Sequence, residues 1–197
     1  MQFSLNFLFL FLFAILKSQN IDSLANIPSD LKETEIRIYK DRGIYNSGNV
    51  FRIYKENKIL KANLIQWFLP KQISRDELEW IKPKITILKS EKSLEEIFAN
   101  IEARNIKYLP EEETFKYKKS SKKVLYDEDE KVFQVTTTLM SVVDGTGYKV
   151  KYQSGKQQNE FDYDNPETYL KEYPQINELQ DFVDILKYIR KEFNIEF

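Results

Sequence analysis

The amino-acid sequence predicts an α+β protein whose sheet is mainly antiparallel. Short segments rich in Ile, Tyr, Phe and Val follow one another along the first part of the chain and recur in its second half. Gly, Asn and Asp separate these segments, as is typical of hairpin turns. Helical patterns occupy separate stretches, so the chain lacks the strand–helix rhythm of a parallel sheet. We therefore expect a meander plus a hairpin with two or three helices, the C-terminal one amphipathic and packed on the sheet.

The first two strands are predicted at residues 33–40 and 50–56, which flank turn-forming residues. Both strands contain the tetrapeptide Arg-Ile-Tyr-Lys, at 37–40 and again at 52–55. Internal structural repeats usually span about 20 residues or more. We therefore interpret the tetrapeptide as the shared alternation of two half-buried strands in an antiparallel hairpin.

Residues 59–69 extend this hairpin by a third strand, and residues 80–88 add a weaker fourth strand that Pro83 interrupts. The four strands form a predicted meander. A helix follows, because Ser93 begins a capping-box pattern and the apolar residues after it share one face. The helix is expected to end near residues 104–105.

The middle of the chain is predicted to contain a connecting segment and a second hairpin. Residues 108–123 form the connection. Residues 131–143 and 148–152 are the two strands of the hairpin, with Asp-Gly at 144–145 as its turn. Residues 160–163 add a further short strand.

Two helices are predicted to complete the chain. Asn165 and Pro166 mark the start of a short helix, with Asn as the cap and Pro at the first position, and Pro174 closes it. The last helix has the clearest pattern, because its apolar residues recur every three or four positions and charged residues occupy the other side. These apolar residues are Leu179, Phe182, Val183, Leu186, Ile189 and Phe193.

An apolar run at residues 7–16 indicates export. A run of about 7 to 15 apolar residues at the N-terminus is typical of a secretory signal peptide and too short to span a bilayer. We predict that residues 1–19 are a signal peptide, cleaved near Gln19 or alternatively after Ala25, and that residues 20–197 form a single α+β domain. The first six residues carry no Lys or Arg, so an uncleaved interfacial anchor is the alternative. No transmembrane span is expected in the mature chain.

The composition excludes several kinds of chemistry. The chain contains no Cys and no His, and 30 Lys and Arg residues stand against 31 Asp and Glu residues. Without Cys and His there is no disulfide, no Ser-His-Asp or Cys-His nucleophile, and no metal or haem site built on those side chains. The net charge of −1 gives no support to nucleic-acid binding. We expect no cofactor, and any catalysis would use carboxylates, Lys, Tyr or Ser.

Four acidic residues form the candidate site: Glu160, Asp162, Asp164 and Glu167. Alternate strand positions would place Asp162 and Asp164 on one side of a strand. A calcium site or a substrate carboxylate site is conceivable here, but the segment lacks the Gly and the spaced ligands of an EF-hand loop. We interpret the acidic residues as helix-start capping, and we expect no metal.

Two other features have a structural interpretation. The Lys-rich stretch at 115–123 lies between acidic runs at 111–113 and 127–130, so we expect a solvated, self-paired surface rather than a site for nucleic acid or anionic lipid. Trp67 and Trp80 could form a carbohydrate platform, but both occur among apolar strand residues, which predicts burial in the core.

Taken together, the sequence predicts a non-catalytic binding or interaction protein of the cell envelope or the extracellular space, whose partner is an envelope protein or an extracellular ligand. The alternative is a glycosidase-like, carboxylate-dependent hydrolase acting outside the cytoplasm, which would need two carboxyl groups about 5 to 9.5 Å apart in a cleft. A structural component of the envelope is a third hypothesis, which an exposed apolar patch beside a sheet edge would favour.

Overall fold

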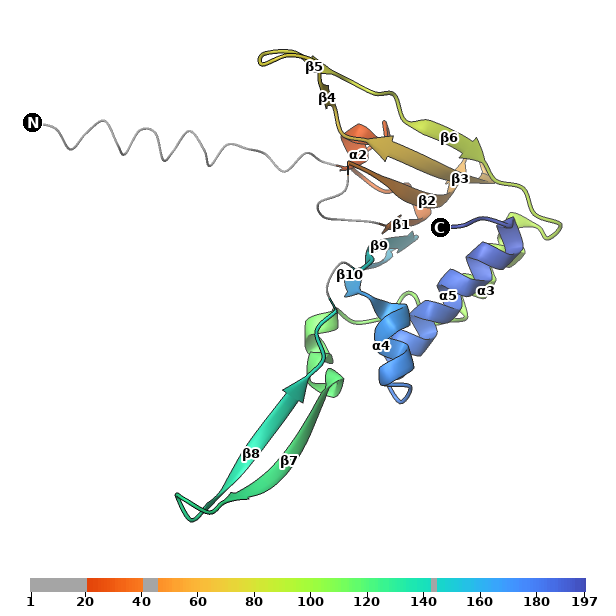
Figure 1. Cartoon of the computed structure of the whole chain (residues 1–197). Helices are drawn as coiled ribbons and strands as arrows, with labels where there is room; N and C mark the ends of the chain where they lie inside the picture. Colours follow the sequence, from red (N-terminus) through yellow and green to blue (C-terminus); the bar gives the residue numbers. More distant parts are fainter. Residues whose placement is uncertain (1–20, 41–45, 143–144) are drawn as a thin grey trace, which may run out of the picture.

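The computed structural model describes residues 21–40, 46–142 and 145–197 and has the predicted α+β fold (Figure 1). A six-stranded antiparallel sheet has the strand order β10-β9-β1-β2-β3-β6. Its strands are β1 (Thr34–Lys40), β2 (Ser47–Glu56), β3 (Ile59–Phe68), β6 (Lys84–Ile87), β9 (Gly147–Ser154) and β10 (Gln157–Asp164). Two small antiparallel sheets pair β4 (Lys71–Gln72) with β5 (Leu78–Glu79), and β7 (Ser120–Asp127) with β8 (Val132–Leu139).

Helices α3 (Leu94–Glu102), α4 (Pro166–Glu172) and α5 (Asn177–Phe193) lie on one side of the six-stranded sheet (Figure 1). A single turn, α2 (Ile21–Leu24), packs on the opposite face. Two 3₁₀ turns, η1 (Glu112–Thr114) and η2 (Lys116–Lys119), lead into β7. Within the described residues, no helix is long and apolar enough to cross a membrane.

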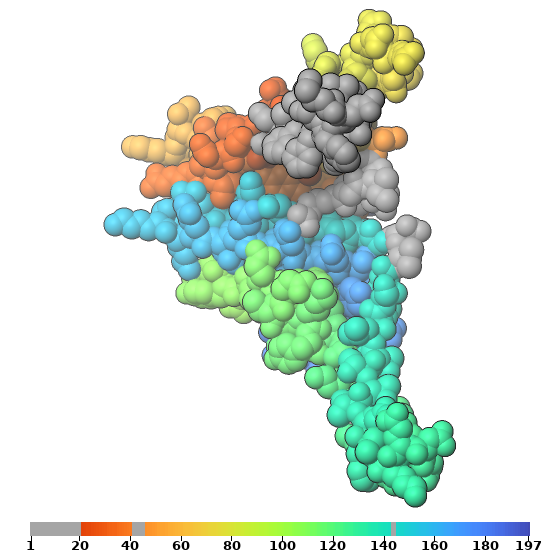
Figure 2. Space-filling model, turned by 90° about the vertical axis from the view of Figure 1, so that its left-hand side faces the viewer, coloured from red at the N-terminus to blue at the C-terminus, as the bar shows by residue number. Residues whose placement is uncertain are grey.

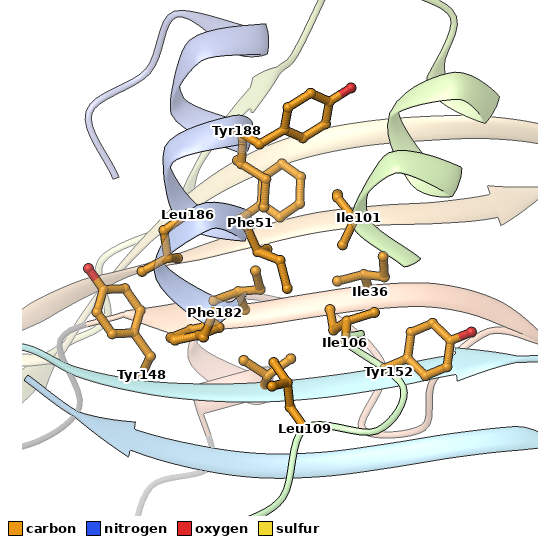
Figure 3. Close-up of a cluster of buried hydrophobic side chains, with 14 of the residues drawn as sticks. Ile36, Phe51, Ile101, Ile106, Leu109, Tyr148, Tyr152, Phe182, Leu186 and Tyr188 are labelled. Carbon is orange, nitrogen blue, oxygen red and sulfur yellow. The ribbon is translucent and has the colours of Figure 1, made fainter. Parts of the chain in front are cut away.

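The main hydrophobic core lies between the sheet and helices α3 and α5 (Figure 3). Successive strand side chains point to opposite faces, so alternate residues of each strand enter this core. From β1 they are Ile36 and Ile38, both fully buried. Phe182 of α5 packs edge-on against Tyr148 of β9, with ring centroids 5.6 Å apart. The amphipathic pattern therefore fixes which side of α5 meets the sheet, as the sequence predicts.

Local signals in the sequence explain where the helices begin and end. The Ser93 side chain accepts a hydrogen bond from the Glu96 backbone N–H at 3.1 Å, which confirms the predicted cap of α3. The helix start at Asn165 and Pro166 is confirmed in position, but Asn165 has a left-handed backbone and makes no side-chain capping bond. The acidic residues before α4 therefore belong to strand β10 rather than to a capping arrangement.

The predicted hairpin between residues 131–143 and 148–152 is wrong. Strand β8 pairs with β7, whereas β9 lies between β1 and β10, where its alternating Tyr and Val side chains are buried in the core. Residue 144 of the expected turn lies outside the described residues. The turn of the observed hairpin comes from Asp127, whose carboxylate accepts bonds from the backbone N–H groups of Asp129 and Glu130.

Two smaller predictions are also corrected. The connecting segment expected at 108–123 ends earlier, because β7 begins at Ser120. Trp67 is buried as predicted, but Trp80 is 66% exposed. Trp80 precedes Pro83, and the strand forms only after this proline, so the Trp80 side chain never enters the sheet.

The core assignment predicts a large difference between two Ile→Ala substitutions. Ile185 of α5 is fully buried, and Ile185→Ala should lower the free energy of unfolding by about 2–5 kcal/mol because it leaves a cavity. Ile87 of β6 is 74% exposed, and Ile87→Ala should change it by no more than about 0.5 kcal/mol. Urea unfolding of both variants tests this, and equal losses would contradict the placement of α5.

Candidate functional site

The structure separates the four acidic residues singled out by the sequence. Glu160, Asp162 and Asp164 lie at alternate positions of β10, on the face opposite to the buried Phe161 and Tyr163. Glu167 lies on the helix side instead.

Two of the four carboxylates form ion pairs. Glu160 forms an ion pair with Lys149, and Glu167 forms one with Arg190 of α5. The Glu167 carboxylate also accepts a hydrogen bond from the Tyr148 hydroxyl at 3.5 Å. Within the described part of the chain, no group of three or more acidic residues is arranged to hold a metal ion.

An open groove of about 650 Å³ lies beside β9 and β10 on the face of the sheet opposite to α5. Asp30 and Glu160 contribute carboxylates to its lining, and Lys151 contributes a positive charge. The remaining lining is mainly polar, with Ser29, Gln153, Gln158 and Asn159 among its residues. Of the four candidate acidic residues, the groove includes Glu160 alone.

A buried network of charges on the same face is the feature that the sequence analysis missed. Glu35 is fully buried, and its carboxylate accepts hydrogen bonds from Arg37 at 2.8 Å and from Arg52 at 2.5 Å. Arg37, also fully buried, reaches the Asp22 carboxylate at 3.0 Å. The network therefore ties the segment that contains α2 to the centre of the sheet.

The repeated Arg-Ile-Tyr-Lys tetrapeptide was the signal for this network. Arg37 and Arg52 are its first residues, and they lie directly opposite each other in the pairing of β1 with β2. Two arginines directly opposite each other on neighbouring strands repel each other unless an anion lies between them. Glu35, two residues before the first tetrapeptide, supplies that anion.

The protonation of Glu35 reflects both its burial and its partners. Burial alone would raise the pKa of the Glu35 carboxyl. The hydrogen bonds from Arg52 and from the Lys32 backbone N–H, together with the charges of both arginines, outweigh burial and lower this pKa. Burial and a hydrogen bond to Asp22 raise the pKa of Tyr39, so its hydroxyl stays protonated beside the network.

Hairpin β7–β8 extends away from the sheet and the helices (Figure 1), and its tip lies at one end of the molecule (Figure 2). The pairing register places Tyr126 opposite Phe133 and Val124 opposite Val135. These four side chains and Leu139 therefore share one face of the hairpin. We call Val124, Tyr126, Phe133, Val135 and Leu139 the apolar face; they are 65%, 46%, 74%, 65% and 67% exposed.

The opposite face of the hairpin is more polar. Its β8 positions are Val132, Gln134, Thr136 and Thr138, and its β7 positions are Ser121, Lys123, Leu125 and Asp127, so it carries two apolar side chains. The hairpin is thus an amphipathic ribbon whose apolar face is uncovered. An exposed apolar patch of this kind marks an interaction surface more often than a simple solvent-facing strand.

The edges of the six-stranded sheet are protected by comparison. On β10, the backbone N–H groups of Asp162 and Asp164 donate to the carboxylates of Glu111 and Glu112 at 3.2 and 2.8 Å. Strand β6 follows Pro83 and begins at Lys84, and proline and lysine both disfavour pairing with another chain. Strand β8 carries neither proline nor a charged residue along its length.

A smaller apolar region lies at the other end of the molecule, around β4 and β5 (Figure 2). Trp80, Ile73 and Leu78 are more than half exposed there. An adjoining hollow of about 430 Å³ is lined partly by Phe68, Leu69, Pro70 and Ile81.

Comparisons with known proteins add no family or function, because no family model, curated protein or solved structure matches the chain.

The buried network predicts a stability loss that depends on pH. Glu35→Gln removes the anion between Arg37 and Arg52 and should lower the free energy of unfolding at pH 7 by about 3–5 kcal/mol. Because the pKa of Glu35 is lowered in the folded state from 4.5, its contribution is complete above pH 4.5 and is lost as the pH falls through the folded-state pKa. Urea unfolding at several pH values should show the wild type and the variant converging in acid.

Glu56→Gln is the matched control, because Glu56 is an exposed carboxyl paired with Lys61. We expect Glu56→Gln to have a much smaller effect. A Glu35→Gln variant as stable as the wild type at pH 7 would contradict the role assigned to the network.

Proposed function

We propose that this chain is an exported binding module that holds another protein chain through hairpin β7–β8. The observation that carries the proposal is the apolar face, whose five large side chains lie in the open on a ribbon that projects from the body. A two-stranded hairpin is only marginally stable in water by itself. A partner that covers the apolar face would both remove this surface from water and stabilise the hairpin.

The charges of the hairpin favour a protein partner over a lipid surface or a nucleic acid. Asp127, Glu128, Asp129 and Glu130 form its tip, followed by one cation, Lys131. This tip would be repelled by anionic headgroups and by phosphates. A protein surface can present apolar and cationic groups together, which suits an apolar ribbon with an acidic tip.

Export is supported by the apolar run at residues 7–16, and the fold favours the earlier of the two cleavage sites. Asp22, Leu24 and Ala25 are all buried, and Asp22 is the partner of Arg37. Cleavage after Ala25 would remove these residues and leave the Arg37 guanidinium without one of its carboxylates. Cleavage near Gln19 would leave the whole network in place.

The mature protein should therefore begin before Ile21. Its intact mass, measured after purification from the culture or envelope fraction of its own host, tests this directly. A mature N-terminus at Asn26 would contradict the part assigned to Asp22. A mass equal to that of all 197 residues would instead support the uncleaved anchor.

The binding role of the hairpin predicts a difference between two neighbouring positions on β8. A photo-crosslinking amino acid at position 135, on the apolar face, should give a covalent adduct with a protein in the host. The same amino acid at position 136 points to the polar face and should give little or none.

Both positions are exposed, so neither change should affect folding, and unchanged thermal unfolding serves as the check. Absence of any protein adduct at position 135, or equal adducts at both positions, would overturn the proposed function.

A further inference from the structure

We propose that the partner of the apolar face is a second copy of this chain, packed face to face about a two-fold axis with the two hairpins antiparallel. This inference rests on the proposed function of hairpin β7–β8 and names the chain that covers it. Three observations carry it: the order of charges along the hairpin, the order of side chains along the apolar face and the pairing of nearby lysines within one copy.

The hairpin carries opposite charges at its two ends. Lys122, on the apolar face, and Lys123, on the opposite face, lie near its base, whereas its tip is the acidic run 127–130. A strand rises about 3.3 Å per residue, so Lys122 and Asp127 are roughly 17 Å apart along β7. This is about two Debye lengths at physiological ionic strength, and the two ends therefore do little to compensate each other within one copy.

The other lysines near the base are already neutralised inside the molecule. Lys116 pairs with Glu113, Lys118 pairs with Glu178, and Lys119 pairs with Glu112. In the described part of the chain, no ion pair forms at Lys122, Lys123, Glu128 or Asp129. The charges left for a partner are therefore a positive base and a negative tip on the same ribbon.

A second hairpin lying antiparallel on the first would satisfy both charges. Its acidic tip would lie at the base of the first copy, and its base would receive the tip of the first copy. A two-fold axis makes every such contact twice, which is the rule for a self-complementary interface. A parallel arrangement would place like charges together at both ends.

The apolar face fits the same symmetry. Val124 and Val135 pair with each other near the middle of the face, between the Lys122 level and the ring pair of Tyr126 and Phe133. A two-fold axis through this valine pair places Lys122 of each copy over the aromatic pair of the other copy. Within one copy, the ring centroids of Tyr126 and Phe133 are 5.0 Å apart. Cations bind favourably over aromatic faces. The Val124–Val135 pair of each copy is then covered by the same pair of the other copy.

Sedimentation velocity of the mature chain purified from its host, over a range of concentrations, tests the proposal. We expect a dimer that dissociates on dilution and weakens with added salt. Val135→Lys should raise the dissociation constant by about tenfold or more, because it places a cation in the centre of the apolar face. Thr136→Lys makes the same kind of change on the opposite face and should leave the dimer intact.

Charge reversal gives a second test that is independent of the apolar side chains. Chains carrying K122E and K123E should be monomeric, because base and tip are then both acidic. Chains carrying E128K, D129K and E130K should also be monomeric, because residues 127–130 then have a net charge of +2 and both ends are basic. An equimolar mixture of the two variants should form a heterodimer, since each base then meets a tip of opposite charge.

The outcomes distinguish this inference from the proposed function. A wild-type monomer at every concentration, together with a position-135 adduct to a different protein, overturns the second copy and leaves the binding module standing. A monomer with no adduct overturns both. Open-ended polymers would show that the hairpin of one copy contacts a different surface of the next copy, such as the sheet edge at β6. If substitutions in β6 abolish these polymers and Val135→Lys does not, the two-fold arrangement is overturned.

Discussion

Glu35 lies fully buried between Arg37 and Arg52 at the centre of the sheet, and one whole face of the sheet is organised around this ionic contact. Helices cover the other face by ordinary apolar packing. On the face opposite to the helices, the Glu35 carboxylate binds both arginines. Arg37 also binds Asp22 and thereby holds the segment that contains α2. Leu24 and Ala25 of that segment then cover Val50, Ile65 and Trp67 in a second apolar cluster.

A buried ion pair is a costly way to hold a segment, because the charges must leave water. The geometry reduces that cost, since the Glu35 oxygens accept bonds from both arginines and from the Lys32 backbone N–H. Glutamates close the β10 edge, and the open groove beside β9 and β10 has a mainly polar lining. The apolar face of hairpin β7–β8 is a larger exposed apolar surface than the region around β4 and β5, and it projects from the body of the protein.

Much of the body could be predicted from the sequence because its signals are local. The alternation in β1, β2 and β3, the Ser93 cap and the spacing of apolar residues in α5 each report on a few neighbouring positions. Strand partnership is different, because it depends on residues far apart in the chain. The strong turn pattern at 144–145 therefore led to the wrong prediction that β8 pairs with β9. In the structure, the turn that begins at Asp127 pairs β8 with β7.

The candidate site shows the same limit. The alternation of the sequence correctly predicted that Asp162 and Asp164 lie on one side of a strand. It could not show that Glu167 forms an ion pair with Arg190 on the helix side of the sheet. It also treated the Lys-rich stretch as self-paired throughout, which holds for Lys116, Lys118 and Lys119 and fails for Lys122 and Lys123 once β7 leaves the body. Exposure of the apolar face is likewise a tertiary property, because Val, Tyr and Phe at alternate positions usually indicate a core strand.

Oxidative labelling by hydroxyl radicals would test the central claim most directly, because it reports which side chains a partner covers. The measurement would compare Phe133 of the apolar face with Trp80, which is exposed at the other end of the molecule. If a protein partner covers the hairpin, Phe133 is protected in the assembly isolated from the host and becomes labelled when the assembly is diluted apart, while Trp80 is labelled throughout. Labelling of Phe133 as strong as that of Trp80 in the undiluted assembly would contradict the account.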